Sequence, residues 1–291
     1  GSTGDYSTAM GYETTASGDL STAMGYDTEA NKSYSTAMGN GTTASGVAST
    51  AMGSNTIASG EKSIAMGEST AATGDYSTAM GSNTTASGDN STSMGNGTKA
   101  SGVASTAMGS GTTASGNTST AMGYNTTASD YFSTAMGYYT IASGYYSTAM
   151  GFQTKANYFY STAIGSGTTA SGNTSTAMGN ETTASGDFST AMGNHTTASA
   201  YFSTALGAFT IASGDNSTAM GSNTTASDYS STVIGQHNSS GSTATSATSF
   251  STLAPAFVIG NGVDASNKSD AFSVLFNGNT TIGGSLTLNS T

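Results

Sequence analysis

The sequence predicts an all-β fold, a parallel β-roll (β-solenoid) built from fourteen-residue coils with two short strands per coil. The first observation is a repeat: a Ser recurs every fourteen residues from Ser7 through Ser231 without exception, which gives seventeen copies, and a Gly stands four residues after each one. The second is alternation within the consensus S-T-A-M-G-x-x-T-x-A-S-G-x-x, which divides into two five-residue segments, each followed by two variable residues. The third is composition, since 40 Gly accompany a single Pro, Pro255, which lies outside the array.

Each coil is expected to contain two strands joined by two-residue turns. The variable slots hold Asn-Gly or Ser-Gly pairs at 40–41, 96–97, 110–111 and 166–167, where positive φ is often required. Stacked strands lie about 4.7–4.9 Å apart, so seventeen coils predict a rod on the order of 80 Å long. A helix is set aside because Gly costs about 1 kcal/mol relative to Ala in a helix interior. Disorder would be favoured by the Gly and Ser/Thr richness, but it does not require a register held over seventeen copies.

Alternation assigns the side chains of each coil to an inner and an outer face. Ser, Ala and Gly at positions 1, 3 and 5 share one face, and Thr, Ala and Gly at positions 8, 10 and 12 share the equivalent face of the second strand. Position 9 accepts Glu29, Ile57 and Lys99, a tolerance typical of a solvent-facing slot. We therefore expect these two faces to line a thin interior of Ala methyls and small hydroxyls.

The opposite face of the first strand carries an apolar ridge at position 4. All fourteen Met of the chain occupy this position. Burying a large apolar side chain is worth roughly 1.5–3 kcal/mol, so a ridge of this length favours self-association, and a homotrimer around an axis is the expected arrangement. The alternative is that Met points inward and Ala outward, which would give a monomer that light scattering or crosslinking would detect. The predicted oligomer interface is Met10, Met24, Met38, Met52, Met66, Met80, Met94, Met108, Met122, Met136, Met150, Ile164, Met178, Met192, Leu206, Met220 and Ile234.

A second candidate site is a concentration of aromatic residues between 131 and 160, mostly in the variable turn slots. Stacked turns would place them near one edge of the roll, and exposed aromatic clusters are typical of recognition surfaces for protein or glycan. The alternative left open is that the rings stack on one another or clamp a neighbouring subunit. The candidate recognition residues are Tyr131, Phe132, Tyr138, Tyr139, Tyr145, Tyr146, Phe152, Tyr158, Phe159 and Tyr160.

The repeat also resembles a known family. S-T-A-M-G followed by T-x-A-S-G is similar to the fourteen-residue head repeat of trimeric autotransporter adhesins of the YadA type, typically written N-S-V-A-I-G, and similar rolls occur in phage and large-virus fibre proteins. The likeness covers about residues 1–238, with Thr in place of Val at position 2 and Met in place of Ile at position 4. The resemblance implies a homotrimer of left-handed parallel β-rolls.

Three segments are expected along the chain: a β-roll array over residues 1–238, a low-complexity linker or irregular coil over 239–255, and a C-terminal β capping segment over 256–291. In the last of these, the apolar runs 257–259, 272–276 and 285–288 are predicted strands, separated by Asn-Gly turns at 261–262 and 277–278. Apolar strands of this kind suit a capping element at the end of a solenoid.

The sequence offers little material for catalysis, metal binding or nucleic-acid binding. The chain lacks Cys, and its two His, His195 and His237, fall in turn slots of different coils, where we expect exposed turn residues. Asp recurs at position 13, as in Asp75 and Asp89, which leaves a calcium ladder open beside an ordinary turn role. A net charge of −11 opposes nucleic-acid binding. We predict no enzyme activity, cofactor, metal or nucleic-acid partner, and no direct membrane insertion, since no apolar run approaches about 20 residues.

The predicted function is extracellular, at a cell surface or on a virion. A trimeric adhesin head or fibre would present the variable turn residues for multivalent attachment, with a host-cell receptor, glycan or matrix surface as partner. A phage or large-virus fibre for host attachment is the alternative within the same fold. An ice-binding β-solenoid is a further alternative, because position 2 forms a ladder of Thr (Thr8, Thr22, Thr36 and onward) at strand spacing.

Overall fold

The computed structural model describes residues 1–287, which form strands and turns but no helix. None of this part of the chain therefore forms a helix long and apolar enough to cross a membrane. The fold is the all-β parallel solenoid that the fourteen-residue repeat predicts. It divides into two compact units, Gly1–Tyr146 and Ser147–Thr291, which are described separately.

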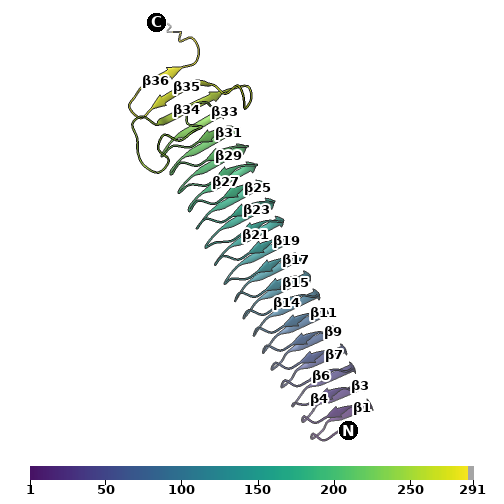
Figure 1. Cartoon of the computed structure of the whole chain (residues 1–291). Coiled ribbons are helices and arrows are strands. Elements are labelled where there is room, and N and C mark those ends of the chain that lie inside the picture. The colour runs from purple at the N-terminus through teal and green to yellow at the C-terminus, as the bar shows by residue number, and fades with distance from the viewer. Residues whose placement is uncertain (288–291) are drawn as a thin grey trace. The chain divides into compact units, whose positions relative to one another are not determined.

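In the first unit every coil contributes a five-residue strand and a two-residue strand, stacked in chain order (Figure 1). The five-residue strands begin at position 2 and are β1 (Thr8–Tyr12), β3 (Thr22–Tyr26), β5 (Thr36–Asn40), β7 (Thr50–Ser54), β9 (Ile64–Glu68), β11 (Thr78–Ser82), β13 (Thr92–Asn96), β15 (Thr106–Ser110), β17 (Thr120–Tyr124) and β19 (Thr134–Tyr138). The two-residue strands cover positions 9 and 10 and are β2 (Thr15–Ala16), β4 (Glu29–Ala30), β6 (Thr43–Ala44), β8 (Ile57–Ala58), β10 (Ala71–Ala72), β12 (Thr85–Ala86), β14 (Lys99–Ala100), β16 (Thr113–Ala114), β18 (Thr127–Ala128) and β20 (Ile141–Ala142).

The second unit continues the same coil and then changes to an irregular end. Its five-residue strands are β21 (Thr148–Phe152), β23 (Thr162–Ser166), β25 (Thr176–Asn180), β27 (Thr190–Asn194), β29 (Thr204–Ala208), β31 (Thr218–Ser222) and β33 (Thr232–Gln236). Its two-residue strands are β22 (Lys155–Ala156), β24 (Thr169–Ala170), β26 (Thr183–Ala184), β28 (Thr197–Ala198), β30 (Ile211–Ala212) and β32 (Thr225–Ala226). Three further strands follow, β34 (Pro255–Asn261), β35 (Asp270–Leu275) and β36 (Thr280–Ile282).

Neighbouring coils pair in parallel and in register, so each repeat position lies beside its own copy fourteen residues away. Met80 is the Cα partner of Met94, and Gly81 that of Gly95. The second strand is shorter than the five residues that alternation predicts. The reason is local: the chain already turns at position 12, where the hydroxyl of Ser77 donates to the carbonyl of Gly74 at 2.6 Å and closes the turn.

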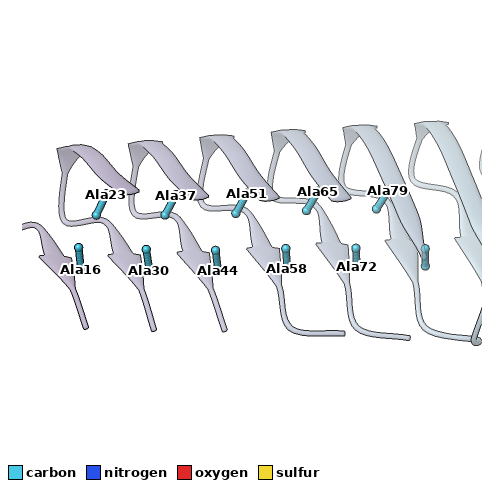
Figure 2. Close-up of a cluster of buried hydrophobic side chains, with 11 residues drawn as sticks. Ala16, Ala23, Ala30, Ala37, Ala44, Ala51, Ala58, Ala65, Ala72 and Ala79 are labelled. Carbon is cyan, nitrogen blue, oxygen red and sulfur yellow. The ribbon is translucent and has the colours of Figure 1, made fainter. Parts of the chain in front are cut away.

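The interior is a double column of alanines. The Ala at positions 3 and 10 have no exposed surface over nearly the whole array, and Figure 2 shows Ala16 and Ala30 of one sheet pointing toward Ala23 and Ala37 of the other. Thr at position 8 and Ser at position 1 are buried with them. The predicted inner face is confirmed for these positions, and the alternative with Met inside and Ala outside is wrong.

Glycine at position 5 does not line the interior, contrary to the sequence prediction. Gly95 is exposed, with a φ of +127°, and a Cβ built on it would lie 1.9 Å from the carbonyl oxygen of Gly109 in the next coil. Position 5 therefore excludes side chains because adjacent backbones stack too closely there. Gly74, at position 12, is buried as predicted, and a Cβ there would meet the backbone of Gly88 at 2.2 Å.

The buried Thr hydroxyls give a first testable prediction. Oγ1 of Thr126 is buried without a hydrogen-bond partner, whereas Oγ1 of Thr98 lies 2.7 Å from the hydroxyl of Ser93, which replaces the usual Ala. An unpaired buried hydroxyl costs about 1–3 kcal/mol, and Val has nearly the same shape. Thr126→Val should therefore raise the free energy of unfolding by about 1 kcal/mol, measured by urea denaturation. The matched change Thr98→Val should lower it, because it orphans Ser93; equal effects in both variants would contradict the prediction.

The last coil is covered on both of its sheet edges. Strand β34 pairs in parallel with β33, and β35 and β36 follow antiparallel. At the β32 edge, the amide of Asn238 both accepts from the N–H and donates to the carbonyl of Thr225, at 2.8 and 2.9 Å, as a neighbouring strand would. The segment after it is anchored by Asp228, whose Oδ1 accepts the N–H groups of Thr245 and Ser246. Covering free edges in this way prevents unwanted strand addition.

The strand predictions for the C-terminal end hold in part. The predicted run 257–259 lies in β34, and residues 272–275 of the predicted run 272–276 lie in β35, whereas Phe276 falls in the turn after it. The third predicted run forms no strand over residues 285–287, and residue 288 lies outside the described residues. The third strand is instead β36, where Thr281 pairs with Ser273.

Candidate functional site

The ridge at position 4 lies on the outer surface of the five-residue strands. Most of its side chains are half-buried, and only Met10 and Met220 are clearly exposed, at 62% and 38%. Half-burial arises because each side chain packs between its copies in the adjacent coils, which are its Cα partners. The ridge is therefore a narrow apolar band that a single chain covers only in part.

The two units differ in how regular this ridge is. In the first unit it consists of Met alone, each one in register with the next. In the second unit Ile164, Leu206 and Ile234 interrupt it, and only Met178 and Met192 are adjacent methionines. The Ile and Leu side chains are half-buried like the methionines, so the slot accepts branched aliphatic residues without change.

Threonine ladders flank the ridge and line the interior. Thr78 and Thr92, at position 2, are half-buried on the same outer face as the ridge. Thr84 and Thr98, at position 8, are fully buried. The outward Thr ladder on which an ice-binding surface would depend therefore shares its face with a continuous row of Met.

The aromatic candidates lie on two edges of the roll rather than on one. Position 6 is the last residue of the five-residue strand and position 7 begins the turn after it, whereas positions 12 to 14 form the turn before the strand, so the two groups are separated by the length of that strand. Tyr145 is half-buried and the other nine are exposed. In the first unit, Tyr138 and Tyr139 lie at the end of the strand, and Tyr131, Phe132, Tyr145 and Tyr146 lie in the turn before a strand. In the second unit, Phe152 lies at the end of a strand, and Tyr158, Phe159 and Tyr160 lie in the turn before one.

The rings stack on one another along each edge. Phe132 lies 4.6 Å from Tyr146 with an interplanar angle of 4°, and Tyr124 lies 5.1 Å from Tyr138 at 10°. Tyr145 stands edge-on to Tyr146, at 87°. Stacking in the coil direction covers ring faces with other rings, so these columns present mainly ring edges and Tyr hydroxyls to solvent. This geometry supports the alternative that the rings ladder on one another, and it disfavours a sugar stacked on a central ring face.

Several of these rings are held in strained backbone. Phe132, Tyr139 and Tyr146 have φ values of 56°, 52° and 56°, a left-handed conformation that Gly and Asn adopt at lower cost. The turn geometry is the one predicted from the Gly pairs, since Gly41 and Gly97 both have φ of 61°. Strain of about 1–3 kcal/mol per residue persists only where the surrounding structure fixes it, which here is the stack of coils.

Stacked ring pairs of the same kind also lie outside residues 131–160, where aromatic residues are less dense and the sequence did not single them out. Tyr12 stacks on Tyr26 at 5.3 Å, and Phe188 stacks on Phe202 at 4.8 Å. Both pairs are fourteen residues apart, so each lies at one repeat position in adjacent coils. The signal that would have found them is the position within the repeat, not the local density of rings.

The two histidines have different surroundings. His195 is exposed, stacks on Phe209 at 4.8 Å and lies 3.1 Å from a carboxylate oxygen of Glu181, through Nδ1. His237 is half-buried, contrary to the expectation, because the chain near Gly262 passes beside it and the N–H of Ser269 donates to its carbonyl oxygen at 3.2 Å. The two side chains belong to different coils, as predicted.

The Asp side chains at position 13 accept hydrogen bonds from the backbone of the preceding coil. Oδ1 of Asp75 accepts the backbone N–H of Glu61 at 2.8 Å, and the N–H of Asp75 donates to Oδ1 of Asp89 at 3.0 Å. Asn117 serves Val103 in the same way. These carboxylates satisfy turn N–H groups of the preceding coil. Within residues 1–287, no three His, Cys, Asp or Glu side chains are grouped closely enough to hold a metal ion.

Two charged side chains have local partners that shift their pKa. Nζ of Lys62 lies 3.2 Å from the hydroxyl of Tyr76 and 3.0 Å from Glu61, and the hydrogen bond to Tyr76 is the main cause that raises the pKa of Lys62. Asp264 accepts the side-chain amide of Asn267 at 2.9 Å, which lowers the pKa of that carboxyl. Both groups are exposed.

The comparisons with known proteins agree with this geometry. The family described as the YadA head domain repeat matches residues 2–28, 16–42, 30–56, 58–84, 86–112, 114–140, 142–157, 159–182, 184–210 and 212–238. No curated protein matches the sequence. The matched stretches cover well over half of the chain and coincide with its stacked coils. The chain therefore belongs to the family of YadA head domain repeat proteins, which are adhesin-type β-rolls.

Proposed function

We propose that the protein is an extracellular, homotrimeric adhesive fibre or head that attaches to a host-cell receptor, glycan or matrix surface. The observation that carries the proposal is the half-buried apolar ridge, which a lone chain leaves in contact with water on ten consecutive coils of the first unit. Packing three such ridges around one axis removes that surface from water, at roughly 25 cal/mol per Å². Membership of a head-repeat family supports the same assembly.

The turn edges are the part of the molecule that we assign to attachment. In the first unit the repeat fixes the interior and the ridge, while positions 6, 7, 13 and 14 vary from coil to coil. A trimer presents three copies of every exposed turn, so several weak contacts to one surface together give a higher avidity than a single chain. The stacked Tyr and Phe columns offer a rigid aromatic surface that loses little side-chain freedom on binding.

Two measurements test the proposal. Light scattering on the full chain should give about 86 kDa, three times 28.5 kDa, and a monodisperse monomer would contradict the assembly. The labelled chain should also bind members of a panel of immobilised matrix proteins and glycans. The double variant Phe132→Asn and Tyr146→Asn should weaken that binding at least tenfold, because it removes one stacked column while keeping a residue that tolerates positive φ. The control, Asn90→Ser, should bind as the unchanged chain does.

A further inference from the structure

The position-4 ridge determines which face of each chain meets its neighbours, but it does not determine their axial register. In the first unit the ridge is Met in every coil, so a neighbouring chain displaced by one coil meets the same side chains again. In the second unit Ile164 and Leu206 are half-buried in the same slot, and their similar volume makes them weak markers of register. A trimer displaced by one coil would lose the contacts of only one coil in seventeen. Registers that differ so little are poorly distinguished unless an aperiodic feature separates them.

The strands after the last coil carry such a feature on the same face. Strand β34 pairs in parallel with β33, so Phe257 is the Cα partner of Thr232 and Ile259 is that of Ile234. Val258, between them, is fully buried, which leaves Phe257 and Ile259 on the outer face. Phe257 therefore takes the place of the Thr that stands at position 2 in all seven coils of the second unit.

The two antiparallel strands β35 and β36 extend this apolar face. Val274 lies opposite Phe257, Phe272 lies opposite Ile259, and Ile282 lies opposite Phe272. The rings of Phe257 and Phe272 lie 6.3 Å apart. The cap face is defined as Phe257, Ile259, Phe272, Val274 and Ile282, of which the first four are half-buried and Ile282 is 39% exposed. It is two apolar side chains wide, whereas a coil of the second unit has one apolar side chain beside a Thr.

The surface that fits the cap face is the cap face of a second copy of this chain. The cap face continues the ridge without a break, because the last ridge residue, Ile234, has Ile259 as its Cα partner. A neighbour that packs along the ridge in register brings its own cap face to the same level. A neighbour displaced by one coil would set Phe257 against a coil with Thr at position 2 and would leave part of one cap face in water. The exposed aromatic and aliphatic surface disfavours that displaced arrangement.

We propose that the cap face sets the axial register of the trimer, with three copies of it packing on one another at the end of the seam. The inference rests on the homotrimer of the proposed function. It gives the cap a role that the repeat cannot fill, because only an aperiodic sequence distinguishes one coil level from the next.

The register can be measured by photocrosslinking at the ridge. All fourteen Met occupy position 4, so a photoactivatable Met analogue incorporated throughout the full chain labels the ridge alone. A crosslink that joins two copies of the same peptide arises only between chains, and the variable turn residues identify each coil by mass spectrometry. The test variant combines Phe257→Thr with Phe272→Thr. The control combines Phe250→Thr with Phe276→Thr, which has the same composition and removes an aromatic pair outside the cap face.

The unchanged chain and the control should give mostly same-coil crosslinks. In the test variant the same-coil fraction should fall about threefold, the value for three neighbouring registers that become equally populated. The mass from light scattering should stay that of the unchanged chain, because the ridge is intact. Hydrogen exchange should show that β34 and β35 remain protected. If that protection is lost, Phe257→Thr alone serves as the test variant, because Thr is the residue that the coils hold at this position.

An unchanged same-coil fraction in the test variant would overturn the proposal. A monomeric test variant would overturn it too, because the cap would then hold the chains together instead of aligning them. An equal fall in the control would trace the effect to the loss of any aromatic pair and would likewise count against the cap face. A monomeric unchanged chain would contradict the proposed function itself, so the two failures are distinguishable.

Discussion

Replacing Gly95 with Ala is expected to break the solenoid at its coil and to lower the free energy of unfolding by about 4 kcal/mol or more. The added Cβ would lie 1.9 Å from the carbonyl oxygen of Gly109, and the backbone there has a φ of +127°, which only Gly adopts easily. No rotamer change relieves a clash between a Cβ and backbone, so the strands on either side must separate. Hydrogen exchange should show lost protection in β13 and β15, and urea denaturation should show a lower midpoint.

The matched control lies two residues away in the same coil. Gly97 also has positive φ, at +61°, but a Cβ built there meets nothing within 4 Å. Ala104 already adopts a φ of 55° in a comparable turn slot. Gly97→Ala should therefore cost only about 1 kcal/mol, the strain of a left-handed residue. If both variants lost stability equally, the close stacking of coils at position 5 would not be the reason for its Gly.

Exchanging Met66, Met80 and Met94 together for Glu is expected to convert the proposed trimer into a monomer. Three carboxylates per chain would have to leave water at the seam, and unpaired buried charges cost several kcal/mol each. The interior of Ala is untouched, since these side chains point outward, and the chain should keep its β signal in circular dichroism. Light scattering should give about 28.5 kDa instead of three times that mass.

The conservative counterpart replaces the same three residues with Leu. Leu keeps the apolar ridge, so the mass should stay that of the unchanged chain. A Glu variant that remained trimeric would place the seam elsewhere on the roll. A Leu variant that dissociated would show that the seam needs the shape of Met itself rather than its apolar character.

Much of the fold could be predicted because a fixed repeat length determines which residues of neighbouring coils lie side by side. A hydroxyl or methyl that recurs every fourteen residues must lie beside its copy if coils stack, and the burial of Ala79 and Ala86 follows from alternation alone. The turn slots could be placed in the same way, since Gly41 and Gly97 mark the residues with positive φ. The ridge at position 4 follows from the same alternation, on the other side of the strand.

The errors arose where contacts between coils, rather than the pattern within one coil, decide the conformation. Alternation predicts Gly95 inside, but in the structure it is exposed, and the backbone of Gly109 in the next coil leaves no room for a side chain there. The aromatic residues were placed on one edge because their density along the chain does not distinguish the turn after the long strand from the turn before it. The recurrence of Asp at position 13 was compatible with a row of calcium sites. The structure shows instead that the carboxylate of Asp75 accepts the backbone N–H of Glu61.

The sequence by itself determined the coil length, the Ala interior, the outward ridge and the slots that are free to vary, because each of these is a periodic property of neighbours along the chain. Only the tertiary structure decided which Gly prevent a collision, which carboxylates satisfy a turn, how the rings stack and how the last coil is covered. Those features depend on distances of a few ångströms between residues fourteen or more positions apart, and a one-dimensional pattern does not specify such distances.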